Sequence, residues 1–201
     1  ILADPEQRAT YEAKFKAQKK ILVQGEQCDK LVFLLHGELI SETTAPCGTF
    51  SMVETFDKPQ IIEPHSLFGK CPCYKATYTA QSDVSLLTID KLYIYGVLDK
   101  YEVFRMNLLN LISNKADQLH EHIWSITPRR LEGRIAHFVR SICSTPNGVK
   151  TLRIRMGDLA KLLDDTRLNV SKVLNKWEKA GIIEMRRKEY IFRAMDNLRE
   201  I

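Results

Sequence analysis

The side chains best suited to chemistry in this sequence lie within residues 156–183, on what the spacing predicts to be a short helix. Val170, Val173, Leu174 and Trp177 fall three or four positions apart and define one buried face. The polar residues off that face are Thr166, Arg167, Asn169, Ser171 and Lys172. Arg and Lys can donate to guanine, Asn can pair with adenine through two hydrogen bonds, and Ser or Thr can contact bases or phosphates. The set therefore favours DNA recognition.

A second short helix must precede these residues in order to present them. It begins near Met156 and ends at Asp164-Asp165, two residues that favour turns. Thr166 can then cap the helix that follows, and Gly181 can end it. Two helices joined by so short a turn predict a helix-turn-helix, whose second helix enters the DNA major groove. The alternative is a helical hairpin whose charged side is simply solvated.

The chain around this motif contains both strand and helix patterns. A surface helix is expected at residues 5–20, where Tyr11 and Phe15 lie four apart. Short β-branched or aromatic runs separated by turn signals follow, at residues 21–23, 31–35, 39–41, 50–56, 61–62, 77–80 and 84–89. Such runs predict an all-β domain built as a double sheet or barrel.

A long helix is predicted after the β domain. Asp90 can cap a short helix to Leu98, and the longer pattern spans residues 99–126. The apolar seam of that pattern is Leu109, Ile112, Ala116, Leu119, Ile123 and Ile126. A sustained heptad seam favours a partner helix, and its copy across a two-fold axis would give a homodimer. Alternatively, the seam packs on the chain's own β domain.

The C-terminal part reads as a winged helix. Thr127-Pro128 breaks the long helix, and an amphipathic helix at residues 131–143 is followed by a turn at Pro146-Asn147-Gly148. A short strand at residues 152–155 precedes the helix-turn-helix. The runs at residues 182–185 and 190–193 predict a hairpin. Its basic tip carries Arg186, Arg187 and Lys188, which suit contacts to DNA phosphates.

Composition narrows the class of protein. Residues 1–126 carry 13 Lys and Arg against 16 Asp and Glu, whereas residues 127–201 carry 17 against 9, so only the C-terminal part has the charge of a nucleic-acid-binding module. No stretch of eighteen apolar residues and no charged-then-apolar leader occurs. Five cysteines without an export signal indicate reduced thiols. We therefore expect a soluble, cytoplasmic protein without a membrane partner. The absence of a leading Met suggests a trimmed N-terminus.

In its order of elements the chain resembles the Crp/Fnr family of bacterial transcription regulators. The matching residues are Gln24-Gly25-Glu26, the strand and glycine of residues 31–39, the long helix, Gly133-Arg134-Ile135-Ala136 and the helix-turn-helix. The resemblance implies a β-roll that senses a small effector, a dimerising helix, and a winged helix that binds a palindromic operator. It also implies that Arg167 and Lys172 read DNA. Leu168 stands where the family often has a carboxylate, and could contact a thymine methyl instead or be buried.

The resemblance places an effector pocket at Gly69, Lys70, Ala76 and Thr77. Family members that bind a cyclic nucleotide carry an Arg-Ser pair for the cyclic phosphate, and here Ala76-Thr77 stands in its place. A buried phosphate would lack its bidentate partner, so cyclic AMP in the usual mode is not expected and the effector stays unidentified. Lys70 and Lys75 could hold another anion. Cys71 and Cys73 have no nearby His, and we expect no metal or other cofactor.

The sequence as a whole predicts an α+β fold with three parts. A double-stranded β-helix (jelly-roll) domain resembling cyclic-nucleotide-binding domains spans residues 1–98, the dimerisation helix spans 99–126, and the winged helix-turn-helix spans 127–201. We expect a homodimeric regulator that binds double-stranded DNA, with RNA polymerase as a further possible partner, and no catalytic residues. The alternatives are a cupin-like metal enzyme, although its histidines are scattered, and an interaction module that does not bind DNA.

Overall fold

The computed structural model describes residues 10–124, 126, 128–145 and 148–193. These residues fall into two compact units. The first is formed by the described residues within 1–40 and 57–124, and the second by those within 41–56 and 125–201. A segment from the N-terminal half of the sequence therefore belongs to the C-terminal unit.

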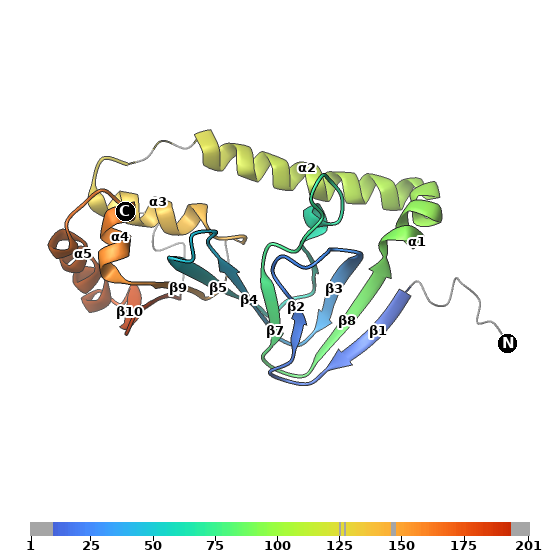
Figure 1. Cartoon of the computed structure of the whole chain (residues 1–201), viewed down its shortest axis with the longest axis horizontal. Coiled ribbons are helices and arrows are strands. Elements are labelled where there is room, and N and C mark those ends of the chain that lie inside the picture. The colour runs from blue at the N-terminus through green and yellow to red at the C-terminus, as the bar shows by residue number, and fades with distance from the viewer. Residues whose placement is uncertain (1–9, 125, 127, 146–147, 194–201) are drawn as a thin grey trace. The chain divides into compact units, whose positions relative to one another are not determined.

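The first unit is built on antiparallel strands (Figure 1). A four-stranded sheet has the order β1-β8-β3-β6, and β2 pairs with β7. The strands are β1 (Thr10–Phe15), β2 (Lys20–Leu22), β3 (Lys30–His36), β6 (Gln60–Ile62), β7 (Thr77–Ala80) and β8 (Val84–Asp90). Leu31 and Ile89 are buried in its core, because the strands turn their alternate residues inward, and Leu67 and Tyr74 of the loop before β7 pack with them.

Helices follow β8 in this unit. Asp90 caps α1 (Lys91–Gly96), since its carboxylate accepts the N–H of Leu92 at 2.7 Å. The 3₁₀ turn η3 (Leu98–Lys100) leads into the long helix α2 (Glu102–Trp124), and a second 3₁₀ turn, η2 (Pro64–Ser66), follows β6. The sequence-predicted helix of residues 99–126 thus forms from Glu102 to Trp124, and Ile126 lies beyond its end.

The second unit contains the helix-turn-helix and its wing. Its antiparallel strands have the order β10-β11-β9-β5-β4. The elements are β5 (Phe50–Phe56), α3 (Leu131–Ser141), β9 (Lys150–Ile154), α4 (Met156–Leu162), α5 (Arg167–Lys179), β10 (Ile183–Arg186) and β11 (Glu189–Phe192). The strand β4 (Leu39–Thr44) begins in the first unit and turns into β5, where the N–H of Ala45 bonds to the carbonyl of Phe50 at 3.0 Å.

Strand β5 extends the winged-helix sheet. It pairs with β9 from Phe50 opposite Ile154 to Glu54 opposite Lys150. Met52 is buried in the same core as Trp177, and the Phe50 ring meets Phe138 of α3 edge-on with centroids 5.4 Å apart. Both ladder hydrogen bonds and apolar packing therefore hold this strand on the C-terminal unit.

The pairing also encloses an ion pair. Lys150 Nζ lies 2.7 Å from Glu54 Oε1, and the two side chains are 0% and 2% exposed. Lys150 Nζ also donates to Thr145 Oγ1 at 2.6 Å, and Glu54 accepts the N–H of Ser144 at 2.9 Å and the Ser144 hydroxyl. The buried charges are compensated within the unit, as burial requires.

The predicted α+β fold class is confirmed, as are the β-roll, the long helix and the winged helix-turn-helix. The predicted helix at residues 5–20 is wrong: residues 10–15 form β1, which pairs with β8, and residues 20–22 form β2. A four-residue spacing such as that of Tyr11 and Phe15 fits a strand as well as a helix, because it is a multiple of the strand period of two. Residues 5–9, Thr127, Pro146 and Asn147 lie outside the described residues. The sequence division at residues 98 and 126 stays a prediction.

Candidate nucleic-acid interface

The helix-turn-helix is fixed by its caps. Thr166 Oγ1 accepts the N–H of Asn169 at 3.2 Å, so α5 begins at Arg167 as the sequence predicts. At the other end Gly181, with φ 71°, donates its N–H to Glu178, and Ile182 donates to Trp177, both at 2.9 Å. These paired bonds are a Schellman ending, which needs a residue with positive φ. Both ends of the predicted recognition helix are therefore set by local sequence.

A network of hydrogen bonds holds the turn between α4 and α5. Asp165 Oδ1 accepts the N–H of Thr166 at 2.7 Å and the side-chain amide of Asn169 at 2.9 Å. Asp165 Oδ2 pairs with Arg134 of α3 at 2.5 Å, and Arg134 also donates to the carbonyl of Leu163 at 2.8 Å. The hydrogen bonds from Asn169 and Thr166, with the Arg134 charge, lower the pKa of Asp165. The carboxylate is therefore ionised at neutral pH and orients Asn169.

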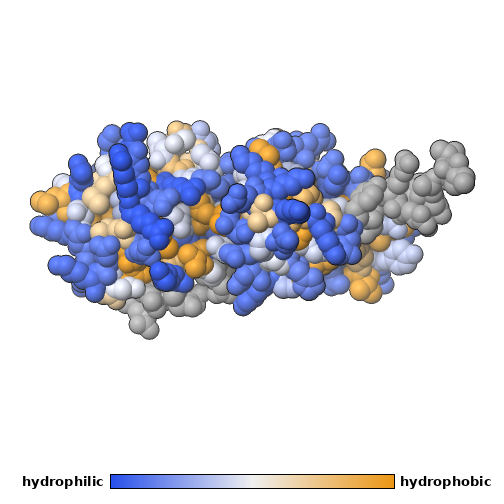
Figure 2. Space-filling model, turned by 90° about the horizontal axis from the view of Figure 1, so that it is seen from below, coloured by the Kyte–Doolittle hydropathy of each residue, from blue (hydrophilic) through white to orange (hydrophobic). Residues whose placement is uncertain are grey.

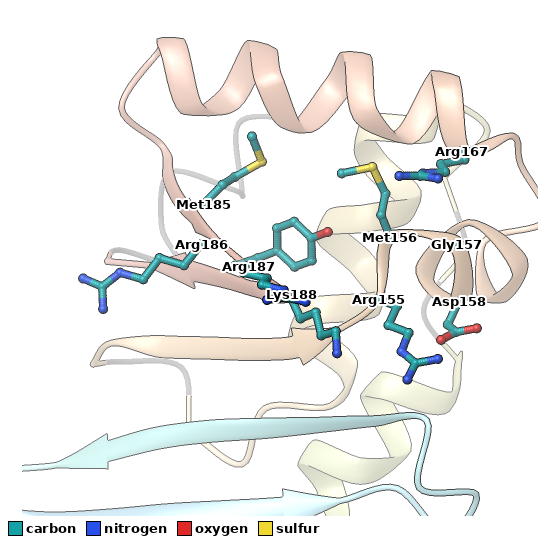
Figure 3. Close-up of a pocket in the computed structure, with 10 residues that line it drawn as sticks. Arg155, Met156, Gly157, Asp158, Arg167, Met185, Arg186, Arg187 and Lys188 are labelled. Carbon is teal, nitrogen blue, oxygen red and sulfur yellow. The ribbon is translucent and has the colours of Figure 1, made fainter.

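A basic groove of about 520 Å³ lies beside the start of α5 (Figure 3). Its walls come from the start of α4, the start of α5 and the wing. The lining residues are Arg155, Met156, Gly157, Asp158, Arg167, Met185, Arg186, Arg187, Lys188 and Tyr190. The lining thus includes five cationic residues and a single carboxylate, Asp158, which is the charge balance expected of a surface that meets phosphates.

The wing that closes the groove is a tight hairpin. Arg186 pairs with Glu189, which leaves Arg187 and Lys188 at the turn, and Lys188 has φ 65°. The Lys188 carbonyl accepts the N–H of Ile154 at 2.9 Å, so the tip is tied to the end of β9. Figure 3 shows the Arg186 side chain extending away from the groove, where Glu184 lies 2.8 Å from its Nη2. Arg187 and Lys188 are exposed at the tip.

The base of the groove includes a phenol that stays protonated. Tyr190 of β11 is buried, and burial raises the pKa of its hydroxyl, although the nearby Arg167 guanidinium offsets part of that rise. A protonated phenol adds no negative charge beneath the cations. The groove therefore keeps its positive character across the neutral pH range.

The predicted DNA-contacting residues are only partly brought together. Arg167, Arg186, Arg187 and Lys188 share the groove, whereas Asn169 and Lys172 are exposed on α5 outside its lining. Ser171 is half-buried and accepts a hydrogen bond from Asn175 at 3.3 Å. Thr166 is occupied as the N-cap.

Sequence reasoning missed three residues of the candidate interface. It did not assign Arg155, which lines the groove immediately before α4, or Arg134 and Asp165, which hold the turn. The position of Arg155 before a predicted helix start was a usable signal. The pairing of Arg134 with Asp165 spans 31 residues and has none.

The predicted effector residues lie in the first unit. Gly69 has φ 115° and Lys70 is exposed, whereas Ala76 is buried and Thr77 Oγ1 accepts the N–H of Gln24 at 3.1 Å. Of three aromatic residues in the same stretch, Tyr74 and Tyr78 are buried and Phe68 is 37% exposed. Within the described ranges, no three His, Cys, Asp or Glu side chains gather as a metal site would require.

The predicted dimer seam lies on α2. Its apolar side chains Leu109, Leu119 and Ile123 are 51%, 52% and 79% exposed, and Ile126 beyond the helix is 90% exposed. Ala116 is exposed as well, and Ile112 is half-buried.

None of the described helices is long and apolar enough to cross a membrane. On the face drawn in Figure 2, hydrophilic residues predominate and apolar ones are scattered between them.

Comparisons with known proteins agree with this architecture. A family model described as a cyclic nucleotide-binding domain matches residues 12–101, and one described as a Crp-like helix-turn-helix domain matches residues 133–201. No curated protein sequence matches the chain.

Several solved structures share the fold. A transcriptional regulator from Thermotoga maritima has a TM-score of 0.52 and 18% identity over 60% of this chain and 95% of its own. FixK2 from Bradyrhizobium japonicum has a TM-score of 0.51 and 13% identity over 95% of this chain and 96% of its own. A CooA variant from Carboxydothermus hydrogenoformans has a TM-score of 0.50 and 16% identity over 100% of this chain and 91% of its own.

Proposed function

Because the chain belongs to the Crp/Fnr family of transcription regulators, we propose that it acts as a homodimer that binds a palindromic operator in double-stranded DNA. The observation that carries this proposal is the basic groove between the start of α5 and the wing. Its cations sit beside a recognition helix whose first turn is capped and exposed.

The groove and the exposed face of α5 support separate roles for two sets of residues, one that contacts phosphates and one that contacts bases. Arg155, Arg187 and Lys188 bind phosphates and fix the register on the duplex, because their charges come from the start of α4 and from the wing tip. Arg167 and Lys172 donate to base edges in the major groove. Asn169 keeps one amide N–H on Asp165, so its other N–H and its carbonyl oxygen are available to read adenine.

Leu168 supplies an apolar contact to the operator. It is 65% exposed on the first turn of α5, which excludes the alternative that it is buried. An exposed leucine beside base-reading residues suits the C5 methyl of thymine, the apolar group of the major groove. We therefore expect a thymine opposite Leu168 in the operator.

The exposed seam of α2 supports the dimer. Leu119 and Ile123, one helical turn apart, are both more than half exposed in the single chain. Pairing two seams would remove this apolar surface from water. A two-fold dimer carries two recognition helices and therefore requires a palindrome whose half-sites lie about 10 base pairs apart, or a multiple of that spacing.

A genomic selection with the purified full chain tests the proposal. The protein is mixed with fragmented genomic DNA, and the retained fragments are sequenced. We expect enrichment of one pseudo-palindromic motif, with affinity that falls as salt rises. A dimer that retains no fragment above background would contradict the DNA-binding function.

A further inference from the structure

The carboxylate of Glu63 lies inside the first unit, in a cradle of four hydrogen-bond donors. Its Oε2 accepts the Ser66 hydroxyl at 2.8 Å and the backbone N–H of Lys75 at 2.7 Å. Its Oε1 accepts the backbone N–H of Ala76 at 2.9 Å and the Tyr78 hydroxyl at 3.2 Å. Each oxygen takes two donors, so the acceptor capacity of the carboxylate is filled.

The cradle is a built feature of the fold. Glu63 is 9% exposed, and Ser66, Ala76 and Tyr78 are buried as well. The donors come from η2, from the end of the following loop and from β7, so segments up to 15 residues from Glu63 converge on one group.

The backbone of Glu63 supports the same conclusion. Its φ of 41° and ψ of 53° place it in the left-handed region, which is unfavourable for a residue with a side chain. Such a conformation persists only where surrounding contacts enforce it. Here the four hydrogen bonds to the carboxylate are those contacts. The four donors are two backbone N–H groups and two hydroxyls, so each of these hydrogen bonds to the carboxylate comes from a neutral group.

We propose that this cradle is the anion-binding site of the β-roll and that Glu63 is its built-in ligand. Two oxygens held by two backbone N–H groups and two hydroxyls are the arrangement that a free carboxylate or phosphate would need. Ala76, predicted for the effector pocket, has already given its N–H to Glu63. A free anionic effector would have to displace a buried, fully bonded group of the chain itself.

One consequence concerns regulation, and it rests on the proposed function. If the β-roll is occupied by its own carboxylate, the chain binds its operator without any added anionic effector. Binding of an anion in the cradle can be measured without DNA, so failure of the DNA-binding proposal would leave the test below unaffected.

Emptying the cradle tests the proposal. Glu63→Gly removes the carboxylate and also accepts the positive φ, so the variant loses the ligand without adding backbone strain. We expect a lower melting temperature for the variant than for the wild-type full chain. Sodium acetate or inorganic phosphate should then raise the melting temperature of Glu63→Gly by several degrees more than sodium chloride does at equal ionic strength. The wild type should show only the general stabilisation that acetate and phosphate give any folded protein, so the excess gained by Glu63→Gly over the wild type is the measure of binding.

Two outcomes would overturn the inference. If acetate and phosphate stabilise the wild type as much as Glu63→Gly, the cradle is open to free anions and Glu63 is not its ligand. If both chains show only the general stabilisation, and neither anion stabilises Glu63→Gly more than it stabilises the wild type, the four donors serve only to fasten the loop.

A second variant keeps the test decisive if Glu63→Gly does not fold. Glu63→Gln retains the length of the side chain, but its amide N–H₂ group, itself a donor, then faces two of the four donors of the cradle. We expect Glu63→Gln to have a lower melting temperature than the wild type. Adding Tyr78→Phe should then lower the melting temperature of Glu63→Gln by less than it lowers that of the wild type, because the lost phenol donor has a weaker acceptor in the variant. Equal effects of Tyr78→Phe in both backgrounds would contradict the role of the carboxylate.

Discussion

At the scale of single residues, the recognition helix α5 depends on a carboxylate that touches no DNA in our proposal. Asp165 joins Arg134 of α3 to Asn169 of α5, and both bonds are 2.9 Å or shorter. Its lowered pKa, caused first by the hydrogen bond from Asn169, means that the charge persists at neutral pH. The orientation of Asn169 is therefore set from outside the recognition helix.

Neutralising this carboxylate should weaken operator binding. In Asp165→Asn the amide can replace one acceptor oxygen but opposes the Arg134 guanidinium with a donor. A lost hydrogen bond is worth about 1 kcal/mol, or roughly fivefold in the dissociation constant. Fluorescence anisotropy with the selected operator measures the change. Asp164→Asn is the matched control, because Asp164 is exposed with φ 49° and Asn tolerates that conformation. Equal losses in the two variants would argue against the network.

His65 gives the first unit a pH-dependent stability. Burial lowers its pKa below 6.5, and Lys115 and Lys75 act in the same direction, whereas Glu63 opposes them. The folded chain therefore binds a proton at this site less readily than the unfolded chain does. The stability that depends on neutral His65 should therefore be fully present above about pH 6.5. The free energy of unfolding should fall as the pH drops below that value.

Denaturant unfolding of the wild type and His65→Gln between pH 5 and pH 8 measures this dependence. The stability difference between the two chains should change with pH across that window. His36→Gln, at an exposed position, is the control and should follow the wild type. A His65→Gln curve parallel to that of the wild type would contradict the assignment.

At the scale of elements, local chemistry predicted most of the structure. The strands at residues 50–56 and 77–80 form with the predicted bounds, and Thr166 and Asp90 cap the helices expected of them. These features depend on alternation and on side chains that bond to their own backbone. The bonds of Asp165 to Arg134 and of Glu54 to Lys150 could not be predicted, because they join residues distant in sequence and depend on the completed packing.

Strand β5 illustrates the limit. Its alternation was evident, but nothing in its sequence indicates that its partner is β9, about a hundred residues later. The bond between Glu54 and Lys150 makes that pairing specific, since another register would separate the two buried charges from each other.

Breaking this pair should destabilise the second unit strongly. Glu54→Gln leaves the Lys150 ammonium buried without a counter-charge, and we expect a loss of about 3–5 kcal/mol in the free energy of unfolding. Glu42→Gln is the matched control on the same hairpin. Its ion pair with Arg153 is 40–45% exposed, so its loss should cost about 0–1 kcal/mol. Chemical denaturation of both variants makes the comparison, and equal losses would contradict the ranking.

At the scale of the whole molecule, the separation of charge and apolar surface assigns one task to each region. The net positive charge belongs to residues 127–201, and the exposed apolar seam belongs to α2. In the proposed dimer the two-fold symmetry repeats the basic groove, and the operator must therefore repeat its half-site.

The seam can be tested separately from DNA. Ile123→Glu places a charge on an apolar position that is 79% exposed in the single chain, so the monomer should fold normally. We expect analytical ultracentrifugation to find monomers of Ile123→Glu at concentrations where the wild type is dimeric. Gln118→Glu adds the same charge to α2 off the seam and should leave the dimer intact. A dimeric Ile123→Glu would place the dimer contact elsewhere.

The central claim is that the start of α5 reads DNA sequence, and the most direct test is the ratio of specific to non-specific affinity at fixed salt. Anisotropy titrations with the selected operator and a scrambled duplex give that ratio for the wild type, Arg167→Ala and Lys179→Ala. We predict that Arg167→Ala weakens operator binding by about 1–3 kcal/mol more than scrambled binding. Lys179→Ala, at the far end of α5, should leave the ratio unchanged. An Arg167→Ala protein with the wild-type ratio would contradict the account.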